Sequence, residues 1–285
     1  MFGCDISEHN GRIDWDTVKG QIGFAILRLG WIGNKNNHTL DTQFERNYSE
    51  CKRLGIPVGT YVYNYCVNEN TARDGAEWAV RKLEGKNLDL PVYIDMEDST
   101  GTTLGKDINT AICVAFNSVI EASGRWAGVY ANLNWFNNYL HKDIIKDKYT
   151  TWIAHYGVSP YKYDGEYDML QYSSDGYVDG ISGRVDVNEM YRDLIDEIAG
   201  GDTPTPEPTP EPAEGGDEPV RVYKNGSTRE NVYSDTSLTN CIGYLNPWEE
   251  CDCFGIFEGR PQVRYRVDGT DRYKIGFCEW VNGVQ

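Results

Sequence analysis

Short apolar runs alternate with amphipathic stretches along the chain before residue 200. The apolar runs are rich in β-branched and aromatic residues, which is typical of buried strands. Between them apolar positions recur at helical spacing, and Gly55 and Gly124 stand where glycines end helices. The expected strands cover residues 23–29, 57–63, 90–98, 127–130, 151–154, 168–172 and 185–187, and the expected helices cover residues 41–54, 71–83 and 108–123.

The alternation of strands and helices indicates the fold class. Repeats of about 30 residues predict an α/β domain built as a parallel barrel or a doubly wound sheet. The glycine-rich patterns GxGxxG and GxxxxGK[ST], which nucleotide-binding sheets carry, do not follow any expected strand. Polar residues gather after the carboxyl ends of many strands, where the sites of barrels lie. We therefore expect a TIM-like (β/α) barrel.

Two acidic residues, Asp95 and Glu97, stand near the end of the apolar run 90–98. Side chains two positions apart on a strand share a face, with Cα atoms about 6.7 Å apart. Two carboxyl groups held this close do not both ionise freely, so one becomes a proton donor beside a carboxylate. This pair suits the hydrolysis of a glycosidic bond. An acid pair at a strand end also occurs where a loop begins or a salt bridge forms, and this alternative stays open.

A segment rich in proline, threonine and glutamate, residues 199–219, divides the chain. Alternating prolines favour extended polyproline II and the acidic residues oppose collapse, so we expect a semi-rigid linker. It would join a first domain, residues 1–198, to a second domain, residues 220–285. Short strands broken by turns such as Lys224-Asn225-Gly226 predict that the second domain is a small all-β barrel, of a kind that binds more often than it catalyses.

The charge of the chain limits its partners. Against 27 basic residues stand 44 acidic ones, which gives a net charge of −17. Such a charge repels the phosphate backbone, so we expect no nucleic-acid partner, whereas a polysaccharide is compatible. No apolar stretch reaches the roughly 18 residues that cross a membrane, so we expect no membrane partner. The oligomeric state does not follow from the sequence.

Eight cysteines and four histidines raise the question of disulfides and metals. No basic segment followed by an apolar one opens the chain, so we expect no signal peptide and reduced cysteines that pack in apolar segments. Cys251-x-Cys253 is not one of the usual zinc spacings, and the histidines form no HxxxH or HExxH pattern. We expect neither a metal nor a cofactor.

Three motifs, in order along the chain, resemble those of glycoside hydrolase family 25, the Chalaropsis-type lysozymes. Residues 3–15, GCDISEHNGRIDW, match the opening pattern D-[IV]-S-x-x-[NQ]-G-x-[IV]-[DN]-[WF] of that family. The segment 95–97, DME, matches its D-x-E strand, and residues 171–173 and 185–188 match its late Q-Y-S and V-D-x-N pattern. The resemblance covers residues 1 to about 198. One departure is Leu170, where members often carry tryptophan.

The resemblance implies a modified (β/α) barrel that hydrolyses the β-1,4 bond between N-acetylmuramic acid and N-acetylglucosamine in peptidoglycan. Carried over position by position, Glu97 is the general acid/base, and Asp95 is the second carboxylate, which stabilises charge that develops at the sugar. Asp5 and Asp186 complete an acidic floor that orients the substrate and helps to keep Glu97 protonated. Neighbouring carboxylates raise the pKa of an acid, which fits these roles. The resemblance points to retention of configuration, and the substrate's own N-acetyl group can serve as the nucleophile in place of a second carboxylate.

Aromatic and amide side chains are further candidates for contact with substrate. Tyr61, Tyr63 and Tyr65 alternate along one expected strand and so share a face. We interpret Tyr65 as a core residue, whereas Tyr61 and Tyr63 either pack in the core or meet a sugar. Tyr130 ends its strand and is a similar candidate. Gln171 either contacts substrate or is a buried amide satisfied by the backbone.

The second domain resembles a bacterial SH3-type module that binds cell walls. The resemblance lies in YKNGSTRE at 223–230, IGYL at 242–245 and YKIGFCEW at 273–280. Similar runs follow lysozyme domains in phage endolysins and autolysins. The two resemblances together imply an endolysin or autolysin that acts on the peptidoglycan of Gram-positive cell walls. Such a protein is either held in the host bacterial cytoplasm until its release or is extracellular.

Two other functions remain open. A metal-dependent polysaccharide deacetylase also attacks wall sugars from a barrel, but it needs an aspartate with paired histidines, and the histidine spacing counts against it. A non-catalytic protein that binds cell-wall polysaccharide would fit the same fold. All four implied acids are present, which counts against a protein that has lost its catalysis.

Overall fold

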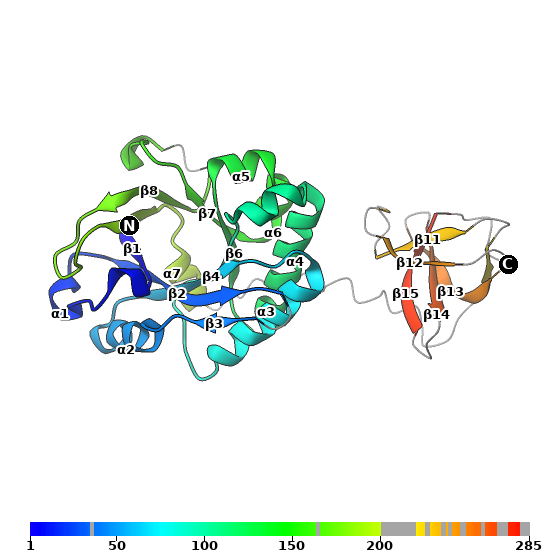
Figure 1. The fold of residues 1–285 in the computed structure, drawn as a ribbon, viewed down its shortest axis with the longest axis horizontal. Helices are drawn as coiled ribbons and strands as arrows, with labels where there is room; N and C mark the ends of the chain where they lie inside the picture. Colours follow the sequence, from blue (N-terminus) through cyan, green and yellow to red (C-terminus); the bar gives the residue numbers. More distant parts are fainter. Residues whose placement is uncertain are drawn as a thin grey trace. The chain divides into compact units, whose positions relative to one another are not determined.

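The computed structural model describes residues 1–34, 37–163 and 166–200 and, in the C-terminal part, residues 221–225, 229–234, 238, 241–245, 249–257, 260–266 and 273–279. The chain divides into two compact units, residues 1–206 and 207–285, both drawn as ribbons in Figure 1. The polyproline II conformation expected for the linker falls on residues 201–220, which lie outside the described residues.

Within the described residues of the first unit, eight strands close into a barrel, and a short ninth strand extends the sheet. The strands follow the order β1-β9-β8-β7-β6-β5-β4-β2-β3, and a parallel pairing of β1 with β2 closes the ring. In chain order the strands are β1 (Phe2–Ile6), β2 (Phe24–Ile32), β3 (Thr39–Leu40), β4 (Val58–Asn64), β5 (Val92–Asp95), β6 (Ala127–Asn132), β7 (Thr150–Ala154), β8 (Met169–Gly176) and β9 (Val185–Met190). This arrangement confirms the expected α/β barrel.

One strand runs against the direction of its neighbours. β9 pairs antiparallel with both β8 and β1, whereas the other pairs of the ring are parallel. A parallel pair needs a crossover of about a dozen residues or more, and the connection 177–184 is too short to provide one. The parallel pairing predicted from the strand–helix repeats holds around the ring except at β9, and the modified barrel that the family resemblance implied is confirmed.

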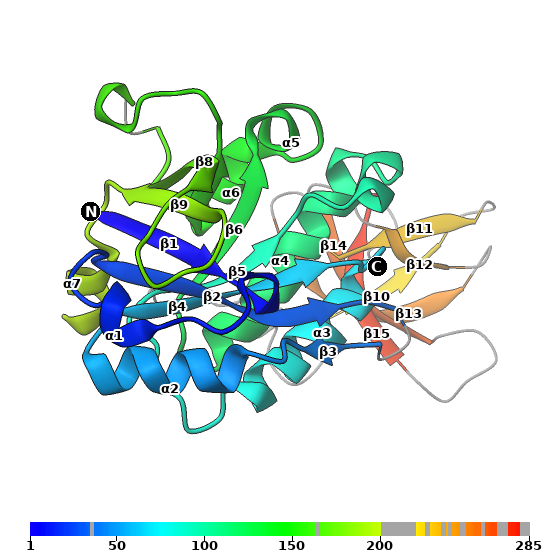
Figure 2. The same cartoon turned by 60° about the vertical axis from the view of Figure 1, so that its left-hand side comes forward.

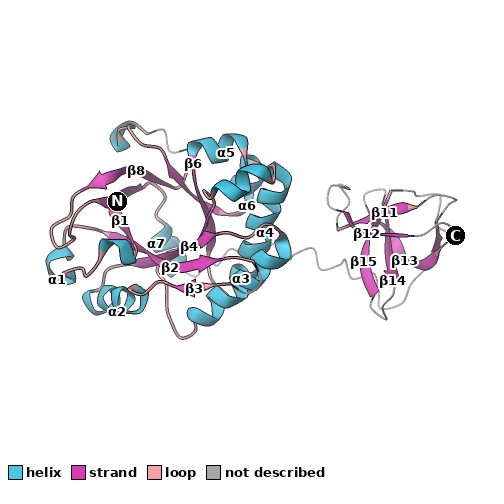
Figure 3. Ribbon diagram, in the orientation of Figure 1, coloured by secondary structure: helices cyan, strands magenta, loops and turns pink. Residues whose placement is uncertain are grey.

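Helices cover the outside of the barrel (Figure 3). Figure 2 shows α2 lying beside the strands β2 and β4. The helices are α1 (Trp15–Val18), α2 (Phe44–Leu54), α3 (Glu69–Lys82), α4 (Lys106–Ala122), α5 (Leu133–Asn138), α6 (Lys142–Lys148) and α7 (Leu194–Ala199), with 3₁₀ helices η1 (Glu8–Asn10), η2 (Ser99–Thr103) and η3 (Pro160–Lys162). Among the described residues, no helix is both long and apolar enough to cross a membrane.

Alternation along each strand sorts side chains between two apolar clusters. On β5, Val92 and Ile94 join the cluster that the surrounding helices cover, whereas Tyr93 joins a second cluster inside the barrel. Asp95 is the next inward position after Tyr93. The barrel interior is thus apolar along most of its length and becomes polar at the carboxyl ends of its strands, where barrel sites lie.

The described strands of the second unit form a six-stranded antiparallel sheet in the order β10-β13-β14-β15-β11-β12. They are β10 (Arg221–Lys224), β11 (Glu230–Tyr233), β12 (Cys241–Leu245), β13 (Glu250–Phe257), β14 (Arg260–Arg266) and β15 (Tyr273–Cys278). Tyr223, Val232 and Val263 are among its buried apolar residues. The expectation of a small all-β unit is confirmed, whereas many of the expected turns, such as residues 226–228, fall outside the described residues.

The tight interior of the barrel gives a first prediction. A Cβ atom on Gly128 of β6 would lie 2.4 Å from the Tyr93 ring and 2.4 Å from the Thr150 hydroxyl oxygen. Both neighbours are buried, so Gly128→Ala is expected to lower the free energy of unfolding by about 1–3 kcal/mol. Denaturant unfolding measures this loss. Gly200→Ala at the exposed end of α7 is the control, and an equal, small effect of both substitutions would contradict the close packing.

Candidate active site

A cavity of about 150 Å³ opens among the carboxyl ends of the barrel strands. It is lined by Asp5, Tyr61, Asp95, Glu97, Tyr130, Trp152, Tyr156, Gln171, Ser174 and Asp186. Seven of the eight residues that the sequence singled out therefore lie in one place, and Tyr63 does not line the cavity. We call Asp5, Asp95, Glu97 and Asp186 the four-acid cluster.

The strands position three members of this cluster directly. Asp5 on β1 and Asp186 on β9 are register partners across an antiparallel pair, so their side chains stand side by side. Asp95 is the last residue of β5. In the parallel registers its neighbours are Tyr63 on β4 and Tyr130 on β6. Asp95 is thus held from both sides by strand pairing.

Glu97 lies beyond the strand on which the sequence placed it. The Met96 N–H still donates to the Tyr130 carbonyl at 2.8 Å, but the chain then turns away to begin η2. The Asp98 side chain caps this 3₁₀ helix by accepting from the Thr100 N–H at 2.9 Å. The expectation of a shared strand face for Asp95 and Glu97 is therefore wrong, although both acids line the same cavity.

Asp5 and Asp186 form a proton-sharing pair. Burial raises the pKa of Asp5 to about 8, and the neighbouring charge of Asp186 adds to the rise. Burial also raises the pKa of Asp186. The two carboxyl groups hydrogen-bond to each other, which requires that one of them carries a proton. The pair as a whole therefore keeps a proton at neutral pH.

Asp95 and Glu97 complete the cluster. Burial, followed by the charges of Glu97 and Asp5, raises the pKa of Asp95 well above its ordinary value. The Oδ1 atom of Asp95 is buried and accepts no hydrogen bond from the described part of the chain. Glu97 is exposed at the cavity mouth, and partial desolvation, followed by the charges of Asp186 and Asp98, raises its pKa too. Each acid of the cluster is therefore harder to ionise than a carboxyl group in water.

Arg28 on β2 is a cation that acts on this cluster. Its charge lowers the pKa of Asp95, against the effect of burial. The guanidinium group, however, contacts Glu8 Oε1 at 2.6 Å and Asp41 Oδ2 at 2.7 Å. The two negative charges of these carboxylates exceed the single positive charge of Arg28, which explains why burial and like-charge repulsion prevail at Asp95.

Gln171 on β8 connects the cluster to two tyrosines. Its Oε1 atom accepts from the Tyr130 hydroxyl at 2.9 Å and from the Tyr156 hydroxyl at 2.7 Å. Its Nε2 atom donates to Asp5 Oδ2 at 2.8 Å. Gln171 is buried, as one of the two alternatives expected, but side chains rather than the backbone satisfy its amide. Gln171 thus fixes the Asp5 carboxyl group and the tyrosine hydroxyls in one network.

Asn188 supports Asp5 from the other side. Its Nδ2 atom donates to Asp5 Oδ2 at 2.9 Å, while its Oδ1 atom accepts from the Trp152 indole N–H at 2.8 Å. Both hydrogen bonds are buried. One oxygen of Asp5 is therefore committed to two amide donors, which leaves the other oxygen for Asp186.

Tyr61 and Tyr63 on β4 and Tyr65 just after it have different surroundings. Tyr61 lines the cavity, with its ring edge-on to Trp152 at 6.0 Å between centroids. Tyr63 donates its hydroxyl to Asp98 Oδ2 at 3.4 Å. Tyr65 is 42% exposed, so the interpretation of Tyr65 as a core residue is wrong. β4 ends at Asn64, and Tyr65 therefore lies beyond the sheet at the open end of the barrel.

Sequence reasoning missed several residues of the site. Tyr156, Ser174 and Asn188 were not singled out. Asn188 does stand in the V-D-x-N motif, and Tyr156 follows the carboxyl end of β7, so both had a signal in their position. Ser174 had none. Among the described residues, no group of three or more histidine, cysteine, aspartate or glutamate side chains is placed to hold a metal ion.

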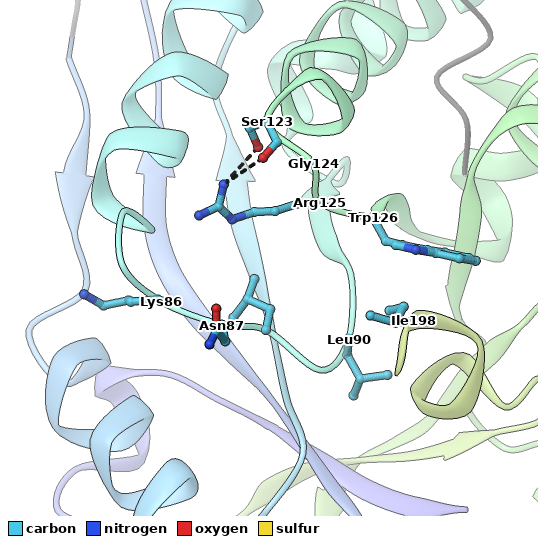
Figure 4. A pocket seen from close by; sticks show the side chains of 9 residues that line it. Lys86, Asn87, Leu90, Ser123, Gly124, Arg125, Trp126 and Ile198 are labelled. Carbon is cyan, nitrogen blue, oxygen red and sulfur yellow. Dashed lines mark hydrogen bonds between the residues drawn. The ribbon is translucent and has the colours of Figure 1, made fainter. Parts of the chain in front are cut away.

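A larger cavity of about 390 Å³ lies at the opposite, amino-terminal end of the strands, where the chain enters β5 and β6. Figure 4 shows Leu90, Trp126 and Ile198 on one side of it. The Arg125 guanidinium donates to the Ser123 hydroxyl at 3.0 Å. No carboxyl group is among its lining residues, so the smaller cavity is the one equipped for proton transfer.

A (β/α) barrel that holds paired carboxyl groups with raised pKa values at the carboxyl ends of its strands has the equipment of a glycoside hydrolase. The sequence profile of Glycosyl hydrolases family 25 matches residues 4–181. The chain belongs to this family.

Individual relatives agree with the family. The autolytic lysozyme of Clostridium acetobutylicum is 28% identical over 226 residues, which cover 79% of this chain and 64% of that protein. The modular autolysin LytC from Streptococcus pneumoniae, solved in complex with a synthetic peptidoglycan ligand, is 30% identical with a TM-score of 0.58, over 67% of this chain and 46% of that chain. The CTP1L endolysin is 26% identical with a TM-score of 0.58, over 70% of this chain and 69% of that chain. This chain therefore spans less than two thirds of the length of the first two relatives.

The raised pKa of Asp5 predicts how stability depends on pH. Folding raises this pKa from 3.8 to about 8, so the folded state keeps a proton that the unfolded chain releases. The resulting stabilisation is complete below pH 3.8 and is lost as the pH rises to about 8. In Asp5→Asn the amide replaces the protonated acid: it donates to Asp186 and accepts from Gln171 and Asn188. The variant is expected to lose less stability than the wild type over this range.

Denaturant unfolding of both proteins at about pH 5 and about pH 8 measures the difference. Asp147→Asn, at an exposed acid on α6, is the matched control and should follow the wild type. Parallel loss of stability in the wild type and Asp5→Asn would mean that Asp5 does not keep its proton in the folded state.

Proposed function

We propose that this protein is a peptidoglycan hydrolase, an N-acetylmuramidase that cleaves the β-1,4 bond between N-acetylmuramic acid and N-acetylglucosamine. The observation that carries the proposal is the four-acid cluster, in which every pKa is raised at the open end of the barrel. The family match and the relatives named lysozyme, autolysin and endolysin support the substrate class.

Glu97 acts as the general acid and then as the general base. Its exposure at the cavity mouth lets its carboxyl group meet the glycosidic oxygen, and its raised pKa favours the protonated form that a general acid needs. Glu97 gives this proton to the oxygen of the departing sugar as the glycosidic bond breaks. The ionised Glu97 then takes a proton from the water molecule that attacks the remaining sugar.

Asp95 stabilises the positive charge that develops at the sugar. Its Oδ1 atom is buried beside the cavity and accepts no hydrogen bond from the described residues, so its negative charge is not committed to a donor of the described chain. A positive charge beside this atom favours the ionised carboxylate, so the interaction strengthens as the transition state forms. The N-acetyl group of the substrate attacks the anomeric carbon while Asp95 stabilises the charge, and configuration is retained.

Asp5 and Asp186 orient the substrate at the floor of the cavity. Two amides hold Asp5, and the proton shared with Asp186 leaves one negative charge on the pair. That charge raises the pKa of Glu97 through Asp186. Tyr61, Tyr130 and Gln171 line the same cavity and are assigned to contact with the sugar, with Tyr63 at its edge.

The second unit is assigned to cell-wall attachment as an SH3-like module, joined by the linker at residues 199–219. Its all-β structure supports this assignment, because small β-barrels commonly serve as binding modules. The organisation is that of an endolysin or autolysin, which acts on the walls of Gram-positive bacteria either after release from the host cytoplasm or from outside the cell.

Digestion of purified Gram-positive cell walls tests the proposal. The wild type is expected to produce new reducing N-acetylmuramic acid ends, and Glu97→Gln is expected to lower the rate by about 10²–10⁴-fold because general acid catalysis is lost. Glu77→Gln on α3, at an exposed acid, is the matched control and should keep full activity.

Each other outcome contradicts a defined part of the proposal. New reducing N-acetylglucosamine ends would overturn the specificity but keep the carboxylate chemistry. Unchanged activity in Glu97→Gln would remove Glu97 from its role. If neither protein produces new ends and both sediment with the walls, the chain is a non-catalytic binder of cell-wall polysaccharide.

A further inference from the structure

We propose that Tyr63, Tyr65 and Trp31 form an additional sugar-binding subsite, which holds the glycan chain where it leaves the catalytic cavity. We call these three residues the aromatic ridge. The proposal rests on the proposed function, because it assumes that the substrate is a polymer of amino sugars. It assigns a specificity role to Trp31 and Tyr65, which lie outside the cavity.

The ridge continues the inward-facing row of β4. Tyr61, Tyr63 and Tyr65 alternate along the same side of the chain, and the row runs from the cavity toward the open end of the barrel. Trp31 on β2 is the register partner of Tyr63, which places it beside this row. The Tyr65 N–H donates to the Ile32 carbonyl at 2.8 Å, which fixes the end of the row against β2.

The Tyr65 ring contacts both of the other two rings. The centroids of Tyr63 and Tyr65 are 4.8 Å apart, with 51° between the ring planes. Trp31 meets Tyr65 edge-on, with centroids 5.7 Å apart and 85° between the planes. These contacts hold the rings in place, so little side-chain freedom is lost when a ligand binds.

The ridge is partly open to solvent. Tyr65 is 42% exposed, and Trp31 and Tyr63 are half-buried, so aromatic surface remains uncovered beside the cavity. Contiguous exposed apolar surface commonly marks a binding site. A sugar suits such rings because its C–H faces pack on the aromatic faces while its hydroxyl groups stay in water.

The position of the ridge indicates that its ligand is the substrate itself. The Tyr63 hydroxyl donates to Asp98, and Asp98 directly follows the proposed acid Glu97. The cavity of about 150 Å³ is also smaller than the roughly 300–1,000 Å³ of common ligand sites, so a polymer must extend beyond it. The ridge offers the neighbouring surface on which the next sugars can lie.

Hydrolysis of soluble glycan fragments of increasing length tests the ridge. Tyr65→Ala and Trp31→Ala are each expected to lower kcat/KM for long fragments by about tenfold more than for the shortest fragment that is cleaved, mainly through KM. Tyr65→Phe keeps the ring and should restore the wild-type dependence on length. Ile144→Ala, at a similarly exposed apolar residue on α6, is the control and should keep the wild-type values for every fragment.

Affinity is measured separately in the Glu97→Gln background, where hydrolysis is slow. Tyr65→Ala is expected to weaken the binding of long fragments by about tenfold and to weaken that of the shortest fragment less. An equal effect on fragments of every length, or no effect in both experiments, would overturn the ridge. If the wild type does not hydrolyse any fragment but the fragments still bind with an affinity that depends on their length and on Tyr65, the ridge stands and the proposed catalysis is contradicted.

Discussion

Four carboxyl groups share a small cavity at the open end of the barrel, and their negative charges would repel one another if all four were ionised. The properties of the site follow from this repulsion. Burial penalises the charged form of each acid, and each negative charge makes the next one harder to form. Arg28 lowers the pKa of Asp95 but does not overcome this repulsion, because its guanidinium group is already paired with Glu8 and Asp41. The cluster instead keeps protons at neutral pH, above all on the pair of Asp5 and Asp186. A site with protons held among carboxylates is prepared for acid catalysis.

The barrel supplies the geometry that makes this possible. Register pairing sets Asp5 beside Asp186 and places Asp95 at the end of β5, so three of the four acids stand on hydrogen-bonded strands. Around them, Gln171 and Asn188 hold one oxygen of Asp5 through buried hydrogen bonds. A buried polar network is stabilising only when its members are satisfied, and here the two amides satisfy Asp5 while tyrosine and tryptophan donors satisfy the amides. The hydrogen bonds of Gln171 and Asn188 therefore both stabilise the barrel interior and hold the Asp5 carboxyl group in place.

Much of this arrangement could be predicted from the sequence, and the exceptions have physical causes. Local signals were reliable: Gly55 ends α2 with a φ of 69°, and the apolar runs became strands. Strand direction has no local signal, so the antiparallel β9 was missed. β5 ends before Glu97, and Asp98 caps the 3₁₀ helix that follows, which the apolar pattern does not indicate. The hydrogen-bond partners of Gln171 lie on strands that are distant in the sequence, so the sequence alone does not reveal them. Exposure of Tyr65 likewise follows from where β4 ends, which periodicity alone does not indicate.

The protonation of Asp5 is the property on which the acidic site depends most directly. A pH titration of the wild type, followed by NMR of the side-chain carboxyl carbons of the assigned aspartates, measures it for each acid. We expect the Asp5 signal to change at about pH 8 and to respond to the titration of Asp186. A midpoint for Asp5 near its ordinary value of 3.8, independent of Asp186, would contradict a proton shared within the cluster.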